Sequence, residues 1–282
     1  MAVPVVESSS TTAFATSATS IVITKPSGLE IGDLLIGTIL YMDSGSSNSL
    51  TSPAGWTNLQ VVDMSDSFRR LYVVYKVATS TETAASNFTF NLAVSGTIGG
   101  GLIRVSGVAS GAEIQTSEKD SYSGSQTVTI NFTGTTTPSY TDSLVMMVLA
   151  AYQNNAATTI GSYTTTPSKT WTEVYEVGNT TTGPDPIIGV ATATAGDTSQ
   201  ITAYGATMSQ AKNTHGGVLL VITPPQSATG TNALLSVSPT LFSQSGSSGT
   251  TGTNALLEVS PTHFSQSGEG LQPTTWTTTT KS

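Results

Sequence analysis

Two aspartates, Asp33 and Asp142, are the residues best placed by their sequence context to do acid–base chemistry. Each precedes a long apolar run, 34–40 and 144–149, which indicates a buried strand. Two carboxylates held roughly 5–10 Å apart could hydrolyse a glycosidic bond. The simpler interpretation, which we favour, is that each aspartate accepts hydrogen bonds in the turn that leads into its strand.

The imidazole and thiol groups available for catalysis are few, because the chain has two histidines and no cysteine. His263 lies in a repeated segment whose other copy carries Leu241, so the repeat does not depend on an imidazole. His215 precedes two glycines that indicate a turn, and we expect it to be a solvated loop histidine. No Gly-x-Ser-x-Gly motif is present. We therefore predict that the protein is not an enzyme.

Neither a cofactor nor a metal site is predicted. Residues 43–48 alternate oxygen-bearing side chains, but with one carboxylate and no closing glutamate they indicate a loop tip rather than a calcium site. Trp56 and Trp171 could be stacking platforms for sugars. Their matched positions in the sequence favour equivalent packing roles in two related halves instead.

The elements that must position these residues are strands. Apolar residues alternate with polar ones through residues 1–223, as in 88–94 and 128–132, and this period is typical of half-buried strands. The denser runs 34–40 and 144–149 indicate central strands that are covered on both faces. No sustained helical period occurs, so any helix should be short. The pattern predicts an all-β fold, an antiparallel β-sandwich of the jelly-roll or immunoglobulin-like kind.

An internal duplication divides this region into a first half, about 1–110, and a second half, about 111–223. Short segments match in the same order along both halves: 20–24 with 126–130, the strand after Asp33 with the strand after Asp142, 53–57 with 167–172, 77–83 with 192–198, and 100–105 with 216–221. Each half thus supplies a similar series of strands. The two halves could form one large sandwich or two adjoining sandwiches.

A tail of different composition, rich in Pro, Gly, Ser and Thr, spans 224–282. It contains a 22-residue unit at 229–250 and a shortened copy at 251–270, with 16 of 20 comparable positions identical. Each copy has a short apolar run, a proline and then a phenylalanine, which suits addition of a strand to a partner's sheet edge. The predicted partner-binding residues are Leu234, Leu235, Val237, Phe242, Leu256, Leu257, Val259 and Phe264.

Charge and hydropathy exclude several classes of partner. Only 9 % of the 282 residues are charged, the net charge is −8, and the nine basic residues are scattered. Nucleic-acid binding needs clustered Lys and Arg, so it is not expected. No apolar stretch reaches the roughly 18 residues that cross a membrane, so membrane insertion is not expected. The N-terminal residues lack the pattern of a signal peptide, and we expect synthesis in a cytoplasm.

Three segments of the first half carry a resemblance to a known module. Residues 25–37 contain a Pro-x-Gly turn and a Gly-Asp-Leu-Leu strand start, 53–57 read Pro-Ala-Gly-Trp-Thr, and 71–78 contain a Tyr-Lys-x-Ala strand. This pattern resembles β-sandwich modules of bacteriophage virion proteins, of the head-fibre, tail-fibre or capsid-decoration kind, and of some bacterial surface proteins. The resemblance covers roughly residues 1–223. It implies structural or attachment roles and brings no catalytic residue.

Together these patterns predict a non-enzymatic structural protein of a phage virion, made in the host cytoplasm and attached to the particle by its repeat tail. The expected partners are other virion proteins, such as capsid or tail subunits, and further copies of this chain. The alternative is a receptor- or glycan-binding adhesin, with a host-surface glycan as the partner.

Overall fold

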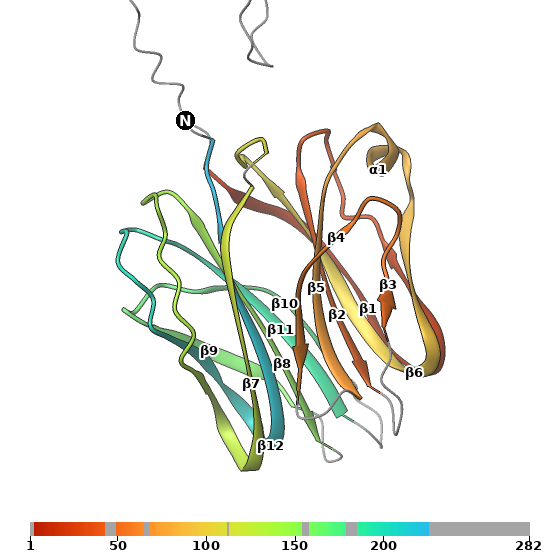
Figure 1. Ribbon diagram of the computed structural model, residues 1–282, viewed down its shortest axis with the longest axis vertical. Coiled ribbons are helices and arrows are strands. Elements are labelled where there is room, and N and C mark those ends of the chain that lie inside the picture. Colours follow the sequence, from red (N-terminus) through yellow and green to blue (C-terminus); the bar gives the residue numbers. More distant parts are fainter. Residues whose placement is uncertain are drawn as a thin grey trace, which may run out of the picture. The chain divides into compact units, whose positions relative to one another are not determined.

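The computed structural model describes residues 3–42, 49–64, 68–111, 113–153, 158–178 and 185–225. This part of the chain is almost entirely antiparallel β-structure with one short helix, as the sequence predicts (Figure 1). The first half forms β1 (Val5–Thr24), β2 (Leu34–Met42), β3 (Leu50–Thr51), β4 (Thr57–Asp63), β5 (Arg69–Val77), α1 (Ser80–Ala84) and β6 (Asn87–Ser106). The second half forms β7 (Ile114–Phe132), β8 (Leu144–Gln153), β9 (Ile160–Thr166), β10 (Thr172–Gly178), β11 (Asp185–Thr194) and β12 (Ala203–Ile222).

The two halves have the same strand order. The first sheet runs β1-β6-β2-β5-β4, and β3 pairs with β6. The second sheet runs β7-β12-β8-β11-β10, and β9 pairs with β12. Every strand of the second half therefore occupies the place of its counterpart in the first half. The topology confirms the duplication. Strand pairing corrects two of the short matches, because Val77 corresponds to Thr194 and Gly100 to Gly217, a shift of two residues and of one residue.

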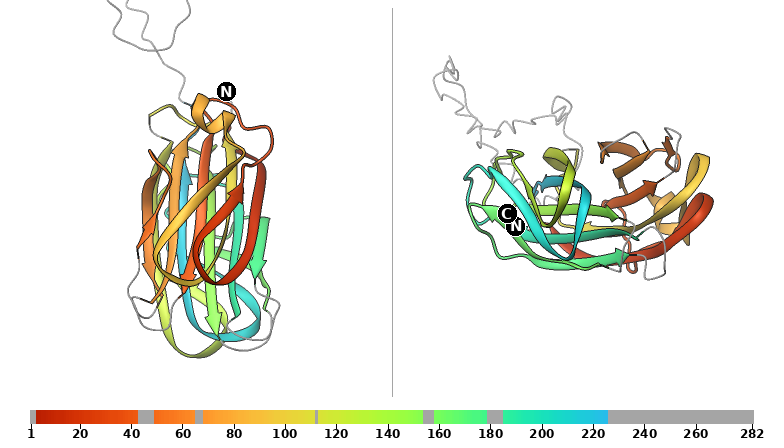
Figure 2. Two further views of the ribbon diagram at one scale, coloured as in Figure 1. Left: turned by 90° about the vertical axis from the view of Figure 1, so that its right-hand side faces the viewer. Right: turned by 90° about the horizontal axis from the view of Figure 1, so that it is seen from below.

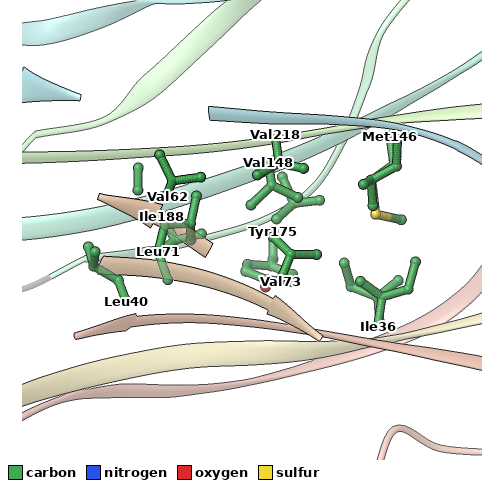
Figure 3. Close-up of a cluster of buried hydrophobic side chains, with 14 of the residues drawn as sticks. Ile36, Leu40, Val62, Leu71, Val73, Met146, Val148, Tyr175, Ile188 and Val218 are labelled. Atoms are coloured by element: carbon green, nitrogen blue, oxygen red, sulfur yellow. The ribbon is translucent and has the colours of Figure 1, made fainter. Parts of the chain in front are cut away.

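A hydrophobic core shared by both halves lies between the two sheets. In Figure 3, Ile36 of β2 and Val73 of β5 project toward Val148 of β8. All nine residues of β2 are buried. Because side chains alternate along a strand, one set faces this shared core and the other set faces the outer side of the sheet. The dense apolar runs are thus central strands covered on both faces, as predicted.

Each half also covers the outer face of its own sheet. The long strands β1 and β6 bend where their register shifts repeatedly between Thr12 and Ser20. Beyond the bend, Ile23 and Phe88 pack with Leu35 in an outer core of the first half. Strands β7, β12 and β9 build the corresponding outer core of the second half. Figure 2 shows these curled ends in both halves.

The contacts between the two sheets follow an approximate twofold relation. Strand β1 contacts β10, and β4 contacts β7. Since β1 corresponds to β7 and β4 to β10, both contacts join the same two kinds of strand, as a twofold axis requires. Each half is a small sandwich with its own outer core. The two small sandwiches pack through their inner sheets like the subunits of a dimer in one chain.

The pairing corrects the expected equivalence of Asp33 and Asp142 by one residue. The Asp33 carbonyl accepts a hydrogen bond from the Ala78 amide at 2.8 Å, and the Ser143 carbonyl accepts one from the Ala195 amide at 2.8 Å. Asp33 and Ser143 each directly precede the first residue of their central strand. Asp33 therefore corresponds to Ser143, and Asp142 lies one position earlier in its turn.

The same shift separates Tyr41 and Tyr152, which lie near the ends of the central strands β2 and β8. Tyr41 pairs with Ile98 and belongs to the outer core of the first half. Tyr152 pairs with Thr214 and packs against the shared core, where the Arg69 guanidinium lies 4.6 Å from the centre of its ring. A shift of one residue moves a side chain to the opposite face of a sheet. These tyrosines are consequently not equivalent.

The close approach of β2 and β6 makes a glycine necessary at position 100. A Cβ atom there would lie 2.3 Å from the Thr38 carbonyl oxygen, whereas a Cβ atom at Gly161 would meet nothing within 4 Å. We expect Gly100→Ala to lower the free energy of unfolding by about 3 kcal/mol, because backbone must move. Gly161→Ala should change it by less than about 1 kcal/mol. Urea unfolding followed by circular dichroism measures both, and equal effects would contradict this packing.

Candidate functional site

Asp33 serves the turn that leads into β2. Its carboxylate accepts hydrogen bonds from the Glu30 amide at 2.8 Å and from Arg104 Nε at 2.6 Å. Asp33 is 7 % exposed, and the Arg104 side chain also has little exposure. Burial strengthens such an ion pair but makes either partner costly to remove. This geometry supports the turn-fixing role for Asp33 and leaves its carboxylate engaged.

Asp142 is exposed in the turn before β8, and its carboxylate lies 3.5 Å from the Thr141 hydroxyl, which can donate to it. In the second half the equivalents of Asp33 and Arg104 are Ser143 and Val221, so the ion pair is replaced by uncharged residues. Asp33 and Asp142 thus belong to different sheets and have different roles.

The two tryptophans occupy equivalent positions, as predicted. Each directly precedes an edge strand, β4 or β10. Trp56 packs edge-on against Phe88 and Phe90, with ring centres 5.3 and 5.4 Å apart. Trp171 packs against the outer core of the second half. Both rings are half-buried in the packing of their own half, which supports a structural role.

The structure contradicts the expectation that His215 is a solvated loop residue. His215 lies within β12, pairs with Ala151 of β8 and Tyr122 of β7, and is 1 % exposed. Gly216 and Gly217, which indicated a turn, continue the strand. A Cβ atom at Gly216 would lie 2.7 Å from Met64. These glycines admit the side chains of neighbouring elements rather than reversing the chain.

A pocket of about 310 Å³ adjoins His215, and we call it the His215 pocket. The described residues that line it are Tyr122, Thr127, Thr129, Asn131 and His215. The Tyr122 ring stacks on the imidazole with 5.5 Å between centres and an angle of 16° between planes. Tyr122 is 40 % exposed, so it forms the outer wall of the pocket.

One ring nitrogen of His215 lacks a hydrogen bond. The imidazole donates a hydrogen bond to the Lys212 backbone carbonyl, whereas buried Nε2 has no partner among the described residues. Nδ1 is therefore the donor. Burial lowers the pKa of His215 to about 4, against the smaller opposing effect of the bond to Lys212. At neutral pH the imidazole is uncharged, and Nε2 carries a lone pair that can accept a hydrogen bond.

The first half has different residues at the positions equivalent to His215 and its neighbour on β8. At the position of His215 it has Ile98, which pairs with Tyr41 of the neighbouring central strand. At the position of Tyr41 the second half has Ala151. A buried tyrosine ring and an isoleucine are thus replaced by a methyl group and an imidazole. The substitution removes apolar volume next to His215, which is one of the residues that line the pocket.

Two further pockets, of about 610 and 460 Å³, share Leu144 and three threonines of β10 and β11. The smaller one also contacts the first residues of β1. Lys169 and Asp197, whose charged groups are 3.8 Å apart, contribute the charges of the larger pocket. Because Asp197 is largely exposed, this pair is screened by solvent. The lining of threonine hydroxyls suits hydrogen bonding to an extended polar segment.

Several sequence predictions concern residues outside the described part. These are the loop 43–48, His263, and the tail residues Leu234, Leu235, Val237, Phe242, Leu256, Leu257, Val259 and Phe264. Within the described ranges, no group of three or more His, Asp or Glu side chains is arranged to hold a metal ion. The helix found in those ranges is too short to span a membrane.

Replacing Asp33 by Asn tests the structural role of its carboxylate. We expect Asp33→Asn to lower the free energy of unfolding by about 2 kcal/mol, since Arg104 loses its ionic partner in a poorly solvated site. Asp142→Asn should change it by less than about 0.5 kcal/mol, because Asp142 is exposed. Thermal and urea unfolding of both variants check this. A larger loss for Asp142→Asn would contradict the corrected register.

The low pKa of His215 predicts a contribution to acid sensitivity. Between pH 6.5 and about 4 the unfolded chain binds a proton at His215 that the folded chain does not, so the free energy of unfolding falls as pH falls. The loss attributable to this residue should reach about 3 kcal/mol. His215→Ile, which copies Ile98, should remove that part. The free energy of unfolding of both proteins is measured as a function of pH, and one curve is subtracted from the other so that the contributions of other titrating groups cancel. Parallel curves would contradict the prediction.

Comparison of the chain with protein-family models, with curated proteins and with solved structures gives no match. The family resemblance is therefore carried by the motifs of residues 25–37, 53–57 and 71–78 alone.

Proposed function

We propose that the protein is a non-enzymatic structural subunit of a bacteriophage virion, a capsid-decoration, head-fibre or tail-fibre component anchored by its repeat tail. The observation that carries the proposal is the combination of a doubled β-sandwich with a repeated tail. Residues 1–223 contain two copies of one sandwich, and the two tail copies share 16 of 20 positions. Two copies of a folded sandwich joined to two copies of an attachment segment suit a protein that binds a surface made of identical subunits.

The polar groups of the sandwich support a structural role. The Asp33 carboxylate and Arg104 hold a turn, and Glu82 completes the capping box of α1 with Thr79. These charged groups stabilise local structure rather than converging on one pocket. The surface otherwise relies on Thr and Ser, with 9 % charged residues in the whole chain. Threonine suits exposed strands because its branched side chain packs on a pleated surface.

The place where the tail begins supports its role as an anchor. Strand β12 ends at Ile222, which pairs with Leu144 at the start of the central strand β8. The tail therefore starts from one of the best-held parts of the sandwich, so a pull on the tail would be transmitted to the core. Within the tail, 234–237 and 256–259 are apolar runs that can add to a partner's sheet edge, with Phe242 and Phe264 as anchors in a pocket beyond it. Two such segments on one chain increase avidity.

A receptor- or glycan-binding adhesin is the second candidate. The His215 pocket favours it, since two of its lining residues, Tyr122 and His215, are replaced by Ala15 and Ile98 in the first half. The two functions are compatible, because virion fibres and decorations are exposed to host surfaces.

Removal of residues 226–282 tests the anchor. We expect a folded, soluble sandwich that no longer joins the particle, and partial loss when only 251–270 is removed, because one of two attachment segments remains. Mass spectrometry of purified particles quantifies incorporation of each form. A matched control replaces 226–282 by a Gly/Ser sequence of equal length, which preserves reach without apolar anchors.

Normal incorporation of the truncated chain would overturn the anchor and place attachment on the sandwich. Absence of the full-length chain from purified particles would overturn the virion assignment. A tail that instead winds into a fibre with other copies would show as loss of trimers on truncation, measured by light scattering of the isolated protein.

A further inference from the structure

We infer that the His215 pocket binds a neutral, hydroxyl-rich ligand, a single sugar residue of a glycan. The pocket has a volume of about 310 Å³. This volume is at the small end of the roughly 300–1,000 Å³ typical of small-molecule sites. The inference concerns the folded sandwich itself and holds whether or not the chain is part of a particle.

The lining residues define the chemistry of the ligand. The described ones comprise one tyrosine, one imidazole, one amide and two threonine hydroxyls, and they carry no formal charge at neutral pH. The Thr127 hydroxyl already forms hydrogen bonds with the backbone of Thr129, so the Thr129 hydroxyl is the one offered to a ligand. A charged ligand would find no ionic partner among them. An apolar ligand would leave their polar groups unpaired. A ligand with several hydroxyl groups can satisfy the amide of Asn131 and the hydroxyl of Thr129 in either direction, because a hydroxyl both donates and accepts.

His215 supplies the strongest constraint on the ligand. Its Nε2 is an acceptor, is buried, and has no partner among the described residues. Because Nδ1 is committed to the Lys212 carbonyl, the ring cannot turn over without losing that bond. The imidazole is thus held with one lone pair available, and it selects a ligand that presents an O–H donor. A buried acceptor that gains a donor on binding contributes to affinity and specificity together.

Tyr122 supplies the second constraint. A sugar ring has one face of C–H groups and a rim of hydroxyls, so it can lie on an aromatic ring while its hydroxyls contact neighbouring polar groups. Tyr122 offers such a ring from strand β7, with its side chain 40 % exposed and stacked over the imidazole.

The first half provides a built-in comparison. There Tyr41 and Ile98 occupy the positions of Ala151 and His215, and both are fully buried. Ala15 takes the place of Tyr122, since Ala15 pairs with Ile98 as Tyr122 pairs with His215. The aromatic ring of the first half, Tyr41, is therefore buried on the central strand β2. That of the second half, Tyr122, is exposed on the edge strand β7. Binding is expected in the second half.

The test uses the full chain in solution and a panel of neutral methyl glycosides: glucoside, galactoside, mannoside, rhamnoside and N-acetylglucosaminide. Glucuronic acid is the charged comparator. Binding is followed by nuclear magnetic resonance of the histidine ring nitrogens. We expect at least one neutral glycoside to bind at millimolar concentration and to shift the Nε2 resonance of His215. Glucuronic acid should bind more weakly.

Two variants separate this site from non-specific association. Tyr122→Ala removes the platform at an exposed position and should weaken binding about fivefold or more. Tyr140→Ala is the matched control, because Tyr140 is 37 % exposed and lies outside the pocket, and it should bind as the unmodified chain does. The inference is overturned if no neutral glycoside shifts the His215 resonance, or if Tyr122→Ala binds as well as Tyr140→Ala.

Discussion

The structure depends on the apolar core shared between the two inner sheets. Each half covers the outer face of its sheet with its own curled strands, but the inner face has no cover within the same half. Burying one large apolar side chain contributes about 1.5–3 kcal/mol, so an uncovered inner face would forfeit a large part of the stability of a half. The second copy supplies the missing cover. Each half therefore depends on the other for the burial of its inner face.

The shared core also tolerates differences between the halves. Tyr175 of β10 reaches across to the first sheet, where its hydroxyl forms a hydrogen bond with Thr38. Gly101 makes room for it, because a Cβ atom there would lie 2.7 Å from the tyrosine ring. The twofold-related place has Gln60 instead of Tyr175, given the shared bulge in both edge strands. The approximate symmetry thus holds for the backbone while individual side chains have diverged.

Period-two patterns and dense apolar runs were sufficient to predict the strands, the central position of β2 and β8, and the duplication. The errors have a common cause. Sequence context pairs Asp33 with Asp142 because both are carboxylates, yet only strand pairing shows that Ser143 is the equivalent residue. The two glycines that follow His215 predict a loop, whereas the structure has a strand there.

Those glycines are required by side chains that approach from other strands, and no local pattern reveals such an approach. The His215 pocket was missed for the same reason. The small side chain of Ala151 matters only because it pairs with His215, and these residues lie far apart in the chain. Sequence patterns therefore predicted the elements, whereas the candidate site depends on contacts between elements.

The differences between the two halves indicate where this fold can acquire a binding site. An unpaired buried acceptor such as His215 Nε2 costs about 1–3 kcal/mol, and the loss of apolar packing opposite it adds to that cost. The first half avoids the loss of packing, because Tyr41 and Ile98 fill its outer core. The second half can accept both costs because its inner face is held by the shared core, which the exchange at the outer face leaves intact. A doubled sandwich thus lets one copy remain a fully packed support while the other takes on a strained, polar pocket. The pocket accordingly lies on the outer side of β12, whereas the inner side of the same strand packs in the core that holds the halves together.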